Sequence, residues 1–412
     1  MKPISELLRE RIKALRMSEI DLRYRAVTRW LQFGSPSGRA PDEFVMDAIE
    51  HAQTHPDAAE FTRVVDPEVV DLPLPHAPPD IQAAYAPRTS FSFPAEGVFR
   101  YRRARVLGGY AGAVIASDGR LIVPFSTDPF GFGRHRSSAR LWLPRRRKLR
   151  GKVAMIATPE AGRNYYHFTM DLLPRLFLLK QAGHPLESFD HILANFGGRA
   201  YETPLLQKFG LPSSRVLNVA SDSHFEVDEL FVPTFCPAEK GVAAWKVNCL
   251  RDTILGKQAG AIPVRDRKKL FLTRKNAAHR RIVNDREIQE AAEALGFTTI
   301  DCGALSVAEQ IATFSTASHV AGMTGAAFTN LLYCPPDAKA VIILSADDLA
   351  GHYWSLNAVR GMPFTVVAGR PSFSMGSESG NRVSRVDIRV DIGEWIAALE
   401  STLCSNPETT LT

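Results

Sequence analysis

The chain has 412 residues, 45% of them hydrophobic, and carries 50 Lys and Arg against 44 Asp and Glu, a net charge of +6. This length and apolar content suffice for two ordinary domains, each with its own core. The positive charge suits an anionic ligand or a membrane surface, but it is modest for a nucleic-acid-binding protein, and no nucleic-acid motif accompanies it. We therefore expect no nucleic acid partner and keep a nucleic-acid-binding protein only as a third alternative.

Five scattered cysteines without a C-x-x-C pair predict neither a disulfide framework nor a zinc site. The N-terminal stretch MKPISELLRERIKALRM lacks the apolar core of a signal peptide, and no later stretch approaches the roughly 20 apolar residues of a membrane span. These features predict a soluble, cytoplasmic protein. The leader has leucines and basic residues at helical spacing, so it could make a peripheral contact with the inner face of the membrane or pack on the body as a solvated helix.

The first elements expected are irregular and then β-rich. Residues 61–93 are rich in proline, as in DPEVVDLPLPHAPP, and predict an extended connector. The runs VFRYRRARVL and GAVIAS-DGR-LIVPF follow, and Asp118-Gly119 in the second is a hairpin turn signal. We expect these strands to open the first domain.

From Gly151 onward, strands and helices alternate, which is typical of βαβ sheets. The first series has strands at KVAMIAT, HILAN, RVLNV and FEVDELFVP, and helices at 164–179, 203–209 and 242–258. The second series has strands at KLFLTR, FTTID, HVAGM, AVIIL and FTVV, with helices near 285–295 and 307–316 and a last amphipathic helix, DIGEWIAALESTL. The predicted fold is α/β, with two Rossmann-like domains facing each other across a cleft. The expected division is an N-terminal extension (1–93), a first domain (94–260), a second domain (261–385) and a C-terminal helix and tail (386–412).

The stretch NYYHFTMDLLPRLFLL combines an apolar helical pattern with two titratable residues. His167 and Asp171 are four residues apart and fall on one helix face. Pro174 lies inside the same pattern, so we expect a kinked helix. The pair could be a functional site or a buried pair whose members satisfy each other.

Several familiar catalytic motifs are missing. The sequence has no G-x-S-x-G elbow, no Walker A motif, no G-x-G-x-x-G after a strand and no H-E-x-x-H. It also lacks a D-x-D pair, which many metal-dependent sugar transferases use to hold a divalent cation. If the protein transfers sugars, cationic side chains and backbone dipoles must replace the metal.

Arginines in the segment LFLTRKNAAHRRIVND are candidates for binding phosphate. Arg274 ends a predicted strand, and Arg280 and Arg281 lie in the following loop, where open α/β sheets bind ligands. Guanidinium groups can hold phosphate oxygens through two parallel hydrogen bonds. The alternative is that these arginines only pair with Asp285 and Glu287.

The segment SHVAGMTGAAFTN runs from a buried strand into a short helix. Gly322 and Gly325 could let the backbone approach a ligand, and the helix N-terminus could receive an anion, although a merely tight connection is the alternative. Upstream, Glu309 and Gln310 open a helix. Their polar side chains could bind ribose hydroxyls, or Glu309 could be an ordinary first-turn acid.

Four ordered motifs together resemble glycosyltransferase family 61. They are N-Y-Y-H-x-x-x-D-L-L-P-R-L, then T-R-K with H-R-R-I-V-N-D, then L-S-V-A-E-Q, and G-M-T-G-A-A-F-T-N with C-P-P-D after it. The resemblance covers residues 152–344. It implies an inverting transferase of the GT-B architecture that uses a nucleotide-sugar donor and a glycan acceptor, with no cofactor and no obligatory metal. Bacterial relatives often serve capsule or other surface-polysaccharide assembly.

The resemblance also implies roles for individual residues. His167 would be the base that deprotonates the acceptor hydroxyl and Asp171 its orienting partner, although the reverse assignment stays open. Thr324 stands where the family usually has histidine, so a catalytically degenerate protein that binds nucleotide sugar or glycan is the second alternative. The donor side would comprise Arg274, Arg280, Arg281, Glu309, Gln310, Gly322, Thr324, Gly325 and Asn330, and the acceptor side Asn164 and Arg175.

Overall fold

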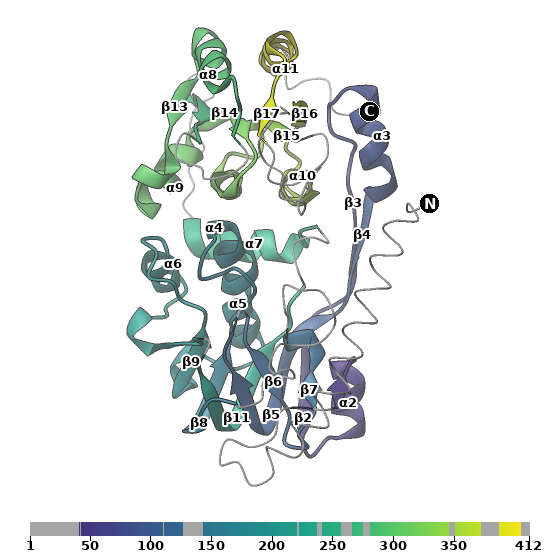
Figure 1. Ribbon diagram of the computed structural model, residues 1–412, viewed down its shortest axis with the longest axis vertical. Helices are drawn as coiled ribbons and strands as arrows, with labels where there is room; N and C mark the ends of the chain where they lie inside the picture. Colours follow the sequence, from purple (N-terminus) through teal and green to yellow (C-terminus); the bar gives the residue numbers. More distant parts are fainter. Residues whose placement is uncertain are drawn as a thin grey trace.

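The computed structural model describes residues 41, 43–109, 111–126, 143–220, 222–236, 241–256, 266–274, 281–345, 351–371 and 387–404. The N-terminal leader, Arg280 and the loop 374–381 lie outside these residues. The described chain is mixed α/β, with a nine-stranded sheet, a six-stranded sheet and a two-stranded ribbon (Figure 1). The domain boundaries given above remain a prediction.

The nine-stranded sheet has the order β1-β7-β6-β5-β11-β8-β9-β10, and β2 also pairs with β5. β11, β8, β9 and β10 run parallel, as the βαβ pattern predicts, whereas β5 pairs antiparallel with β2, β6 and β11. The strands are β1 (Phe44–Val45), β2 (Ala59–Val65), β5 (Glu96–Leu107), β6 (Ala113–Ile115), β7 (Leu121–Ile122), β8 (Arg147–Met155), β9 (His191–Ala194), β10 (Val216–Asn218) and β11 (His224–Pro233).

The hairpin predicted at Asp118-Gly119 is confirmed. β6 and β7 pair antiparallel, with Val114 opposite Ile122. The turn needs its glycine because Gly119 has φ +92°, in the left-handed region. The Asp118 side chain accepts from the backbone N–H of Arg120 at 3.0 Å. The turn therefore holds Asp118 in a fixed place.

The helix predicted from residue 164 is divided into three parts. α4 (Tyr165–His167) is followed by a π-helical stretch, η4 (Phe168–Leu172), and then by α5 (Leu173–Gln181). Pro174 lies in the first turn of α5, where its missing N–H costs little. In place of a kink at Pro174, the helix has a π-helical turn just before it. Such turns inside α-helices are frequent at functional sites. The other helices of this half are α2 (Ala48–Thr54), α6 (Glu202–Lys208) and α7 (Ala244–Leu255).

The six-stranded sheet has the order β13-β12-β14-β15-β16-β17, and all its strands except β17 run parallel. The chain moves outward from β12 to β13 and then returns past β12 to β14, so the direction of winding reverses between β12 and β14. The strands are β12 (Lys268–Leu272), β13 (Thr298–Ile300), β14 (Ala317–Met323), β15 (Lys339–Ser345), β16 (Phe364–Pro371) and β17 (Ile388–Arg389).

Helices cover both faces of this second sheet. α8 (Asp285–Ala294) and α11 (Ile392–Cys404) share a core with one face, in which Trp395 is fully buried. The other face shares a core with α9 (Val307–Ser315), the 3-10 helix η10 (Ala326–Tyr333) and α10 (Gly351–Val359). That core continues into α4, α5 and α7, which lie between the two large sheets (Figure 1). The two sheets are therefore joined by one layer of packed helices.

The segment predicted as an extended connector (61–93) is more ordered than expected. It contains most of β2, the ribbon strands β3 (Glu68–Asp71) and β4 (Ser90–Phe93), and the helix α3 (Pro79–Tyr85). His76 exchanges backbone hydrogen bonds with β16, from its N–H to Phe364 O and from Val366 N–H to its carbonyl. The sequence pattern missed this because the partners are strands far away in the chain. We call residues 66–93 the strap, since they run beside both sheets (Figure 1).

Trp354 is expected to fasten the strap to α10. Its side chain is 1% exposed, and its indole N–H donates to Pro73 O at 2.7 Å. Trp354→Phe should lower the free energy of unfolding by about 1–3 kcal/mol, since it removes this hydrogen bond and part of a fully buried ring. Chemical denaturation measures the loss. Val69→Ala, at an exposed strap position, is the control and should change stability by less than about 0.5 kcal/mol; equal effects of the two variants would contradict the fastening role.

Candidate functional site

The carboxyl ends of β12 and β14 meet where the winding of the second sheet reverses. Open α/β sheets bind ligands at such reversals. Arg274 follows β12, and its guanidinium donates to the carbonyl of Thr324, which follows β14. Gly322 has no room for a side chain, because an added Cβ would lie 2.7 Å from Leu272 O. Two of the predicted donor-side segments are thus brought together.

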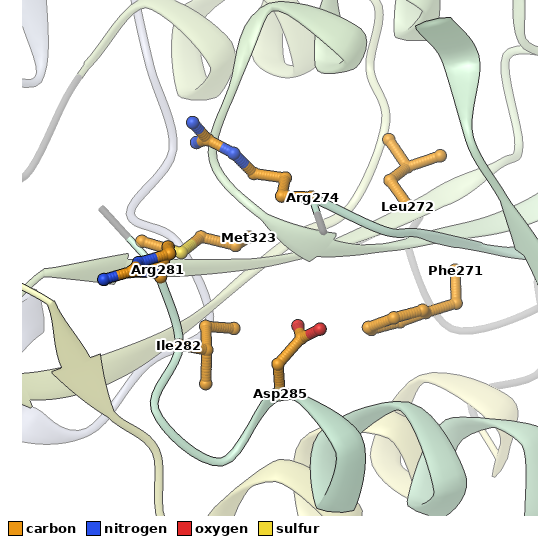
Figure 2. A pocket seen from close by; sticks show the side chains of 7 residues that line it. All are labelled: Phe271, Leu272, Arg274, Arg281, Ile282, Asp285 and Met323. Carbon is orange, nitrogen blue, oxygen red and sulfur yellow. The ribbon is translucent and has the colours of Figure 1, made fainter. Parts of the chain in front are cut away.

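A pocket of about 160 Å³ lies beside this contact. Figure 2 shows the Arg274 side chain in the upper part of the view, Arg281 at the left about halfway down, and the Asp285 carboxylate below both. Arg281 is bound to Asp387, through its backbone N–H at 2.9 Å and its guanidinium at 3.1 Å. The predicted alternative partner, Asp285, lines the same pocket. Cations and an acid at this position give the pocket the polar groups needed to hold an anionic ligand with hydroxyl groups.

His167 and Asp171 form the pair that their spacing predicts. His167 Nδ1 lies 2.7 Å from Asp171 Oδ2, and the exposed fractions are 30% for the histidine side chain and 2% for the aspartate. A carboxylate at Nδ1 holds the proton on that nitrogen, which leaves Nε2 able to accept one. This arrangement can therefore perform general base catalysis, with Asp171 as the buried orienting group.

Helix α10 connects this pair to the glycine loop. The ring of Tyr166 lies 4.8 Å from that of His352 and 5.5 Å from that of Tyr353, centroid to centroid. Tyr353 donates its hydroxyl hydrogen to Gly325 O at 2.7 Å. Burial, and then the charge of Asp171, raise the pKa of Tyr166. The residue after Tyr166 is His167, so α10 lies between the histidine and the loop.

The structure buries Arg175, which the resemblance assigns to the acceptor side. Only 3% of it is exposed, and its guanidinium donates to Ala157 O and Pro233 O. Desolvation lowers the pKa of Arg175 to about 9, while the charges of Glu96 and then Asp171 act in the opposite direction. Arg175 thus ties α5 to the carbonyls of Ala157 and Pro233, and its positive charge interacts favourably with Asp171. Asn164 is half-buried and caps α4, since its side chain accepts from Tyr166 N–H at 2.9 Å.

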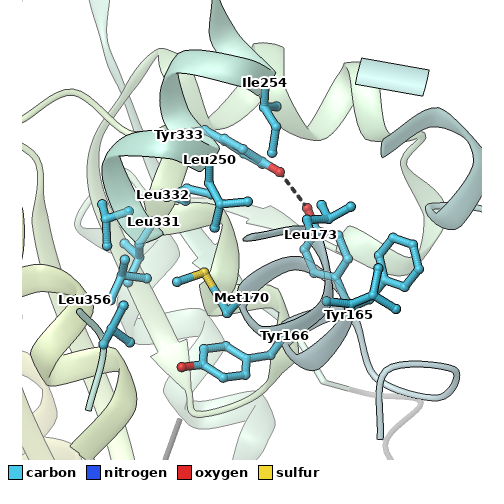
Figure 3. Packing of buried hydrophobic residues seen from close by; sticks show 14 of the residues in the cluster. Tyr165, Tyr166, Met170, Leu173, Leu250, Ile254, Leu331, Leu332, Tyr333 and Leu356 are labelled. Atoms are coloured by element: carbon cyan, nitrogen blue, oxygen red, sulfur yellow. Dashed lines mark hydrogen bonds between the residues drawn. The ribbon is translucent and has the colours of Figure 1, made fainter. Parts of the chain in front are cut away.

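Three residues expected on the donor side have structural partners. Glu309 completes a capping box with Ser306 at the start of α9 and is exposed. Gln310 and Asn330 are buried and bonded to each other at 2.8 Å. Asn330 also accepts from the Tyr165 hydroxyl, which lies 3.1 Å from the Tyr333 hydroxyl (Figure 3). Through these bonds Gln310 and Asn330 join the two halves of the chain.

Sequence reasoning missed the residues that approach the pair from the second half. His352 and Tyr353 lie in the stretch GHYWSLN, which matches no motif of a site. Their position next to Tyr166 comes from the packing of α10 on α4 and depends on contacts nearly 190 residues apart in sequence. No local signal could have identified them.

Comparisons with known proteins agree with the resemblance. Residues 165–342 match the family model described as Glycosyltransferase 61, within the range 152–344 expected from the motifs. No curated protein matches the chain. Among the described residues, no helix combines the length and apolar character needed to cross a membrane.

The His167 pair can be tested by a substitution that keeps its hydrogen bond. His167→Gln retains a donor toward Asp171 but cannot take a proton, so it should lower the transfer rate about 10²- to 10⁴-fold while the melting temperature stays near the wild-type value. His167→Ala strands the buried carboxylate and should also destabilise the protein by about 1–3 kcal/mol. Initial rates and thermal melts separate the effects. A wild-type rate in a folded His167→Gln protein would remove the histidine from the chemistry.

Proposed function

We propose that the protein, whose residues 165–342 match the family model of glycosyltransferase 61, moves a sugar from a nucleotide-sugar donor to a glycan acceptor with inversion at the anomeric carbon. The observation that carries the proposal is the meeting of Arg274 with the Thr324–Gly325 loop at the reversal of the second sheet. A nucleoside diphosphate would bind there. The proposed architecture is GT-B, with the donor held by the second sheet and the acceptor approaching from α4.

The proposed mechanism uses side chains and backbone only. His167 Nε2 takes the proton of the acceptor hydroxyl as its oxygen attacks the anomeric carbon, and Asp171 stabilises the protonated imidazole. The bond from the anomeric carbon to the diphosphate oxygen breaks at the same time. Arg274 and Arg281 offset the negative charge that grows on the leaving diphosphate, which is a task that fixed cations perform well.

The wider setting is proposed from the resemblance alone. The glycan would belong to a capsule or another surface polysaccharide, and the transferred sugar would be a hexose or a pentose. The proposed compartment is the cytoplasm, at the inner face of the membrane if the leader makes a peripheral contact. The free thiols of all five cysteines agree with a reducing compartment.

A catalytically degenerate binder is the second candidate, because of Thr324. This residue is 5% exposed, its N–H donates to Ile343 O at 3.0 Å, and its carbonyl accepts from Arg274. Thr324 thus supports the loop and brings no positive charge to the phosphate. A protein of this kind would bind the donor and leave it intact.

Slow donor hydrolysis should separate these two candidates. Incubated with a panel of nucleotide sugars, a transferase should release nucleoside diphosphate from at least one of them, and excess EDTA should leave the release rate unchanged, because the arginines take the role of a metal. Chromatography of the nucleotides measures the release. A rise in melting temperature with no release from any donor would favour the binder, and loss of release in EDTA with recovery in manganese would contradict the metal-free mechanism.

The two arginines should contribute to donor affinity separately. Charge-assisted hydrogen bonds to phosphate are worth about 1.5–3 kcal/mol, so Arg274→Ala and Arg281→Ala should each weaken nucleoside diphosphate binding about 10- to 150-fold. Titration calorimetry measures the affinity. The matched control is Arg286→Ala on α8, an exposed arginine paired with Glu290, which should bind normally. Unchanged affinity in both test variants would remove these arginines from the donor site.

A further inference from the structure

Three side chains with metal-ligating atoms meet at one end of the nine-stranded sheet. His51 and His55 come from α2 and its C-cap, and Asp118 comes from the turn between β6 and β7. One ligand atom of each lies within 4.8 Å of the others. His51 Nε2 is 3.3 Å from Asp118 Oδ2, and the two imidazole rings stack with their centroids 4.7 Å apart.

The surrounding backbone holds these three residues in place. His51 and His55 are four residues apart, so they share one helix face. β1 pairs with β7, and Leu121 N–H donates to Glu43 O at 2.9 Å, so the chain entering α2 is tied to the hairpin that carries Asp118. The site is therefore built from two elements with a fixed separation.

The ring of His51 is buried but makes few hydrogen bonds to the rest of the protein. It is 4% exposed, and within the described chain its Nδ1 has no hydrogen-bond partner. Its contact with Asp118, at 3.3 Å, is longer than most hydrogen bonds. Burial of a polar ring with so little compensation is unfavourable. A metal ion on one ring nitrogen would supply a strong bond.

Arg120 already brings a positive charge to this position. Its guanidinium lies 3.7 Å from Asp118 Oδ2 and 3.4 Å from His55 Nε2. It also contacts Glu43 Oε2 at 3.0 Å, and that carboxylate is 68% exposed. Arg120 can therefore keep one ion pair with Glu43 when it moves away from the histidines. The arginine and a metal ion would compete for the same place.

We propose that His51, His55 and Asp118 bind a zinc ion. Two imidazoles and one carboxylate suit zinc in a tetrahedral site whose fourth ligand is water, whereas magnesium and calcium prefer oxygen ligands. The site lies beside α2, far from α9 and α10 (Figure 1). The ion joins α2 to the β6–β7 hairpin and stabilises this end of the sheet. It takes no part in sugar transfer, so the proposal does not depend on the proposed function.

Zinc added to the untagged, full-length protein after removal of metals tests the proposal. One equivalent should bind by calorimetry and raise the melting temperature, as for any ligand of the folded state. Cobalt in place of zinc should give the visible absorption of a tetrahedral site. His55→Gln and Asp118→Asn should each weaken binding about 10-fold or more. His191→Gln, which changes a half-buried histidine on β9, is the matched control and should bind zinc normally.

Arg120→Gln provides a test in the opposite direction. It removes the competing cation and keeps a similar shape, so zinc should bind several-fold more tightly than to the wild type. Zinc that fails to bind the wild-type protein, or that binds His55→Gln and Asp118→Asn as tightly as the wild type, would overturn the proposal. Zinc affinity lowered by Arg120→Gln would contradict the competition.

Discussion

A buried hydrogen-bonded joint between the two halves of the chain determines where the rest of the site lies. The Tyr165 hydroxyl donates to Asn330 Oδ1 at 3.0 Å, and Asn330 Nδ2 donates to Gln310 Oε1 at 2.8 Å. Asn330 is fully buried, so a polar group of this network left without a partner would carry an uncompensated desolvation penalty. This penalty holds the hydrogen bonds in their observed geometry. His167 lies two residues after Tyr165, and Gly325 lies immediately before η10. The joint therefore fixes the separation between the histidine and the glycine loop.

This rigidity has a consequence for how substrates enter. The helices α4, α5 and α7 share one continuous apolar core with η10 and α10, so the contact between the halves is held by packing as well as by the joint (Figure 3). The strap adds a backbone connection to β16 through His76. The polar groups of the Arg274 pocket and the His167 side chain remain accessible, so the proposed substrates would enter from there.

The elements and contacts predicted correctly are those that depend on residues close together in the sequence. Periodicity located the helices α6 to α9 and the parallel strands, and the spacing of His167 and Asp171 predicted their contact. The arginine after β12 and the glycines at the end of β14, with Gly322 inside the strand and Gly325 just after it, were predicted because open sheets bind ligands at strand ends. The strap, the burial of Arg175 and the approach of His352 depend on partners distant in sequence. The sequence also does not reveal that Gln310 and Asn330, both predicted on the donor side, bond to each other.

We propose that a nucleoside diphosphate binds at the reversal between β12 and β14. Hydrogen exchange of backbone amides, with and without saturating UDP or GDP, measures this most directly. Exchange should slow at residues 322–328 and 272–274 with at least one of the two nucleotides and stay unchanged along β5. Protection confined to the nine-stranded sheet, with the loop after β14 unaffected, would contradict nucleotide binding at this reversal.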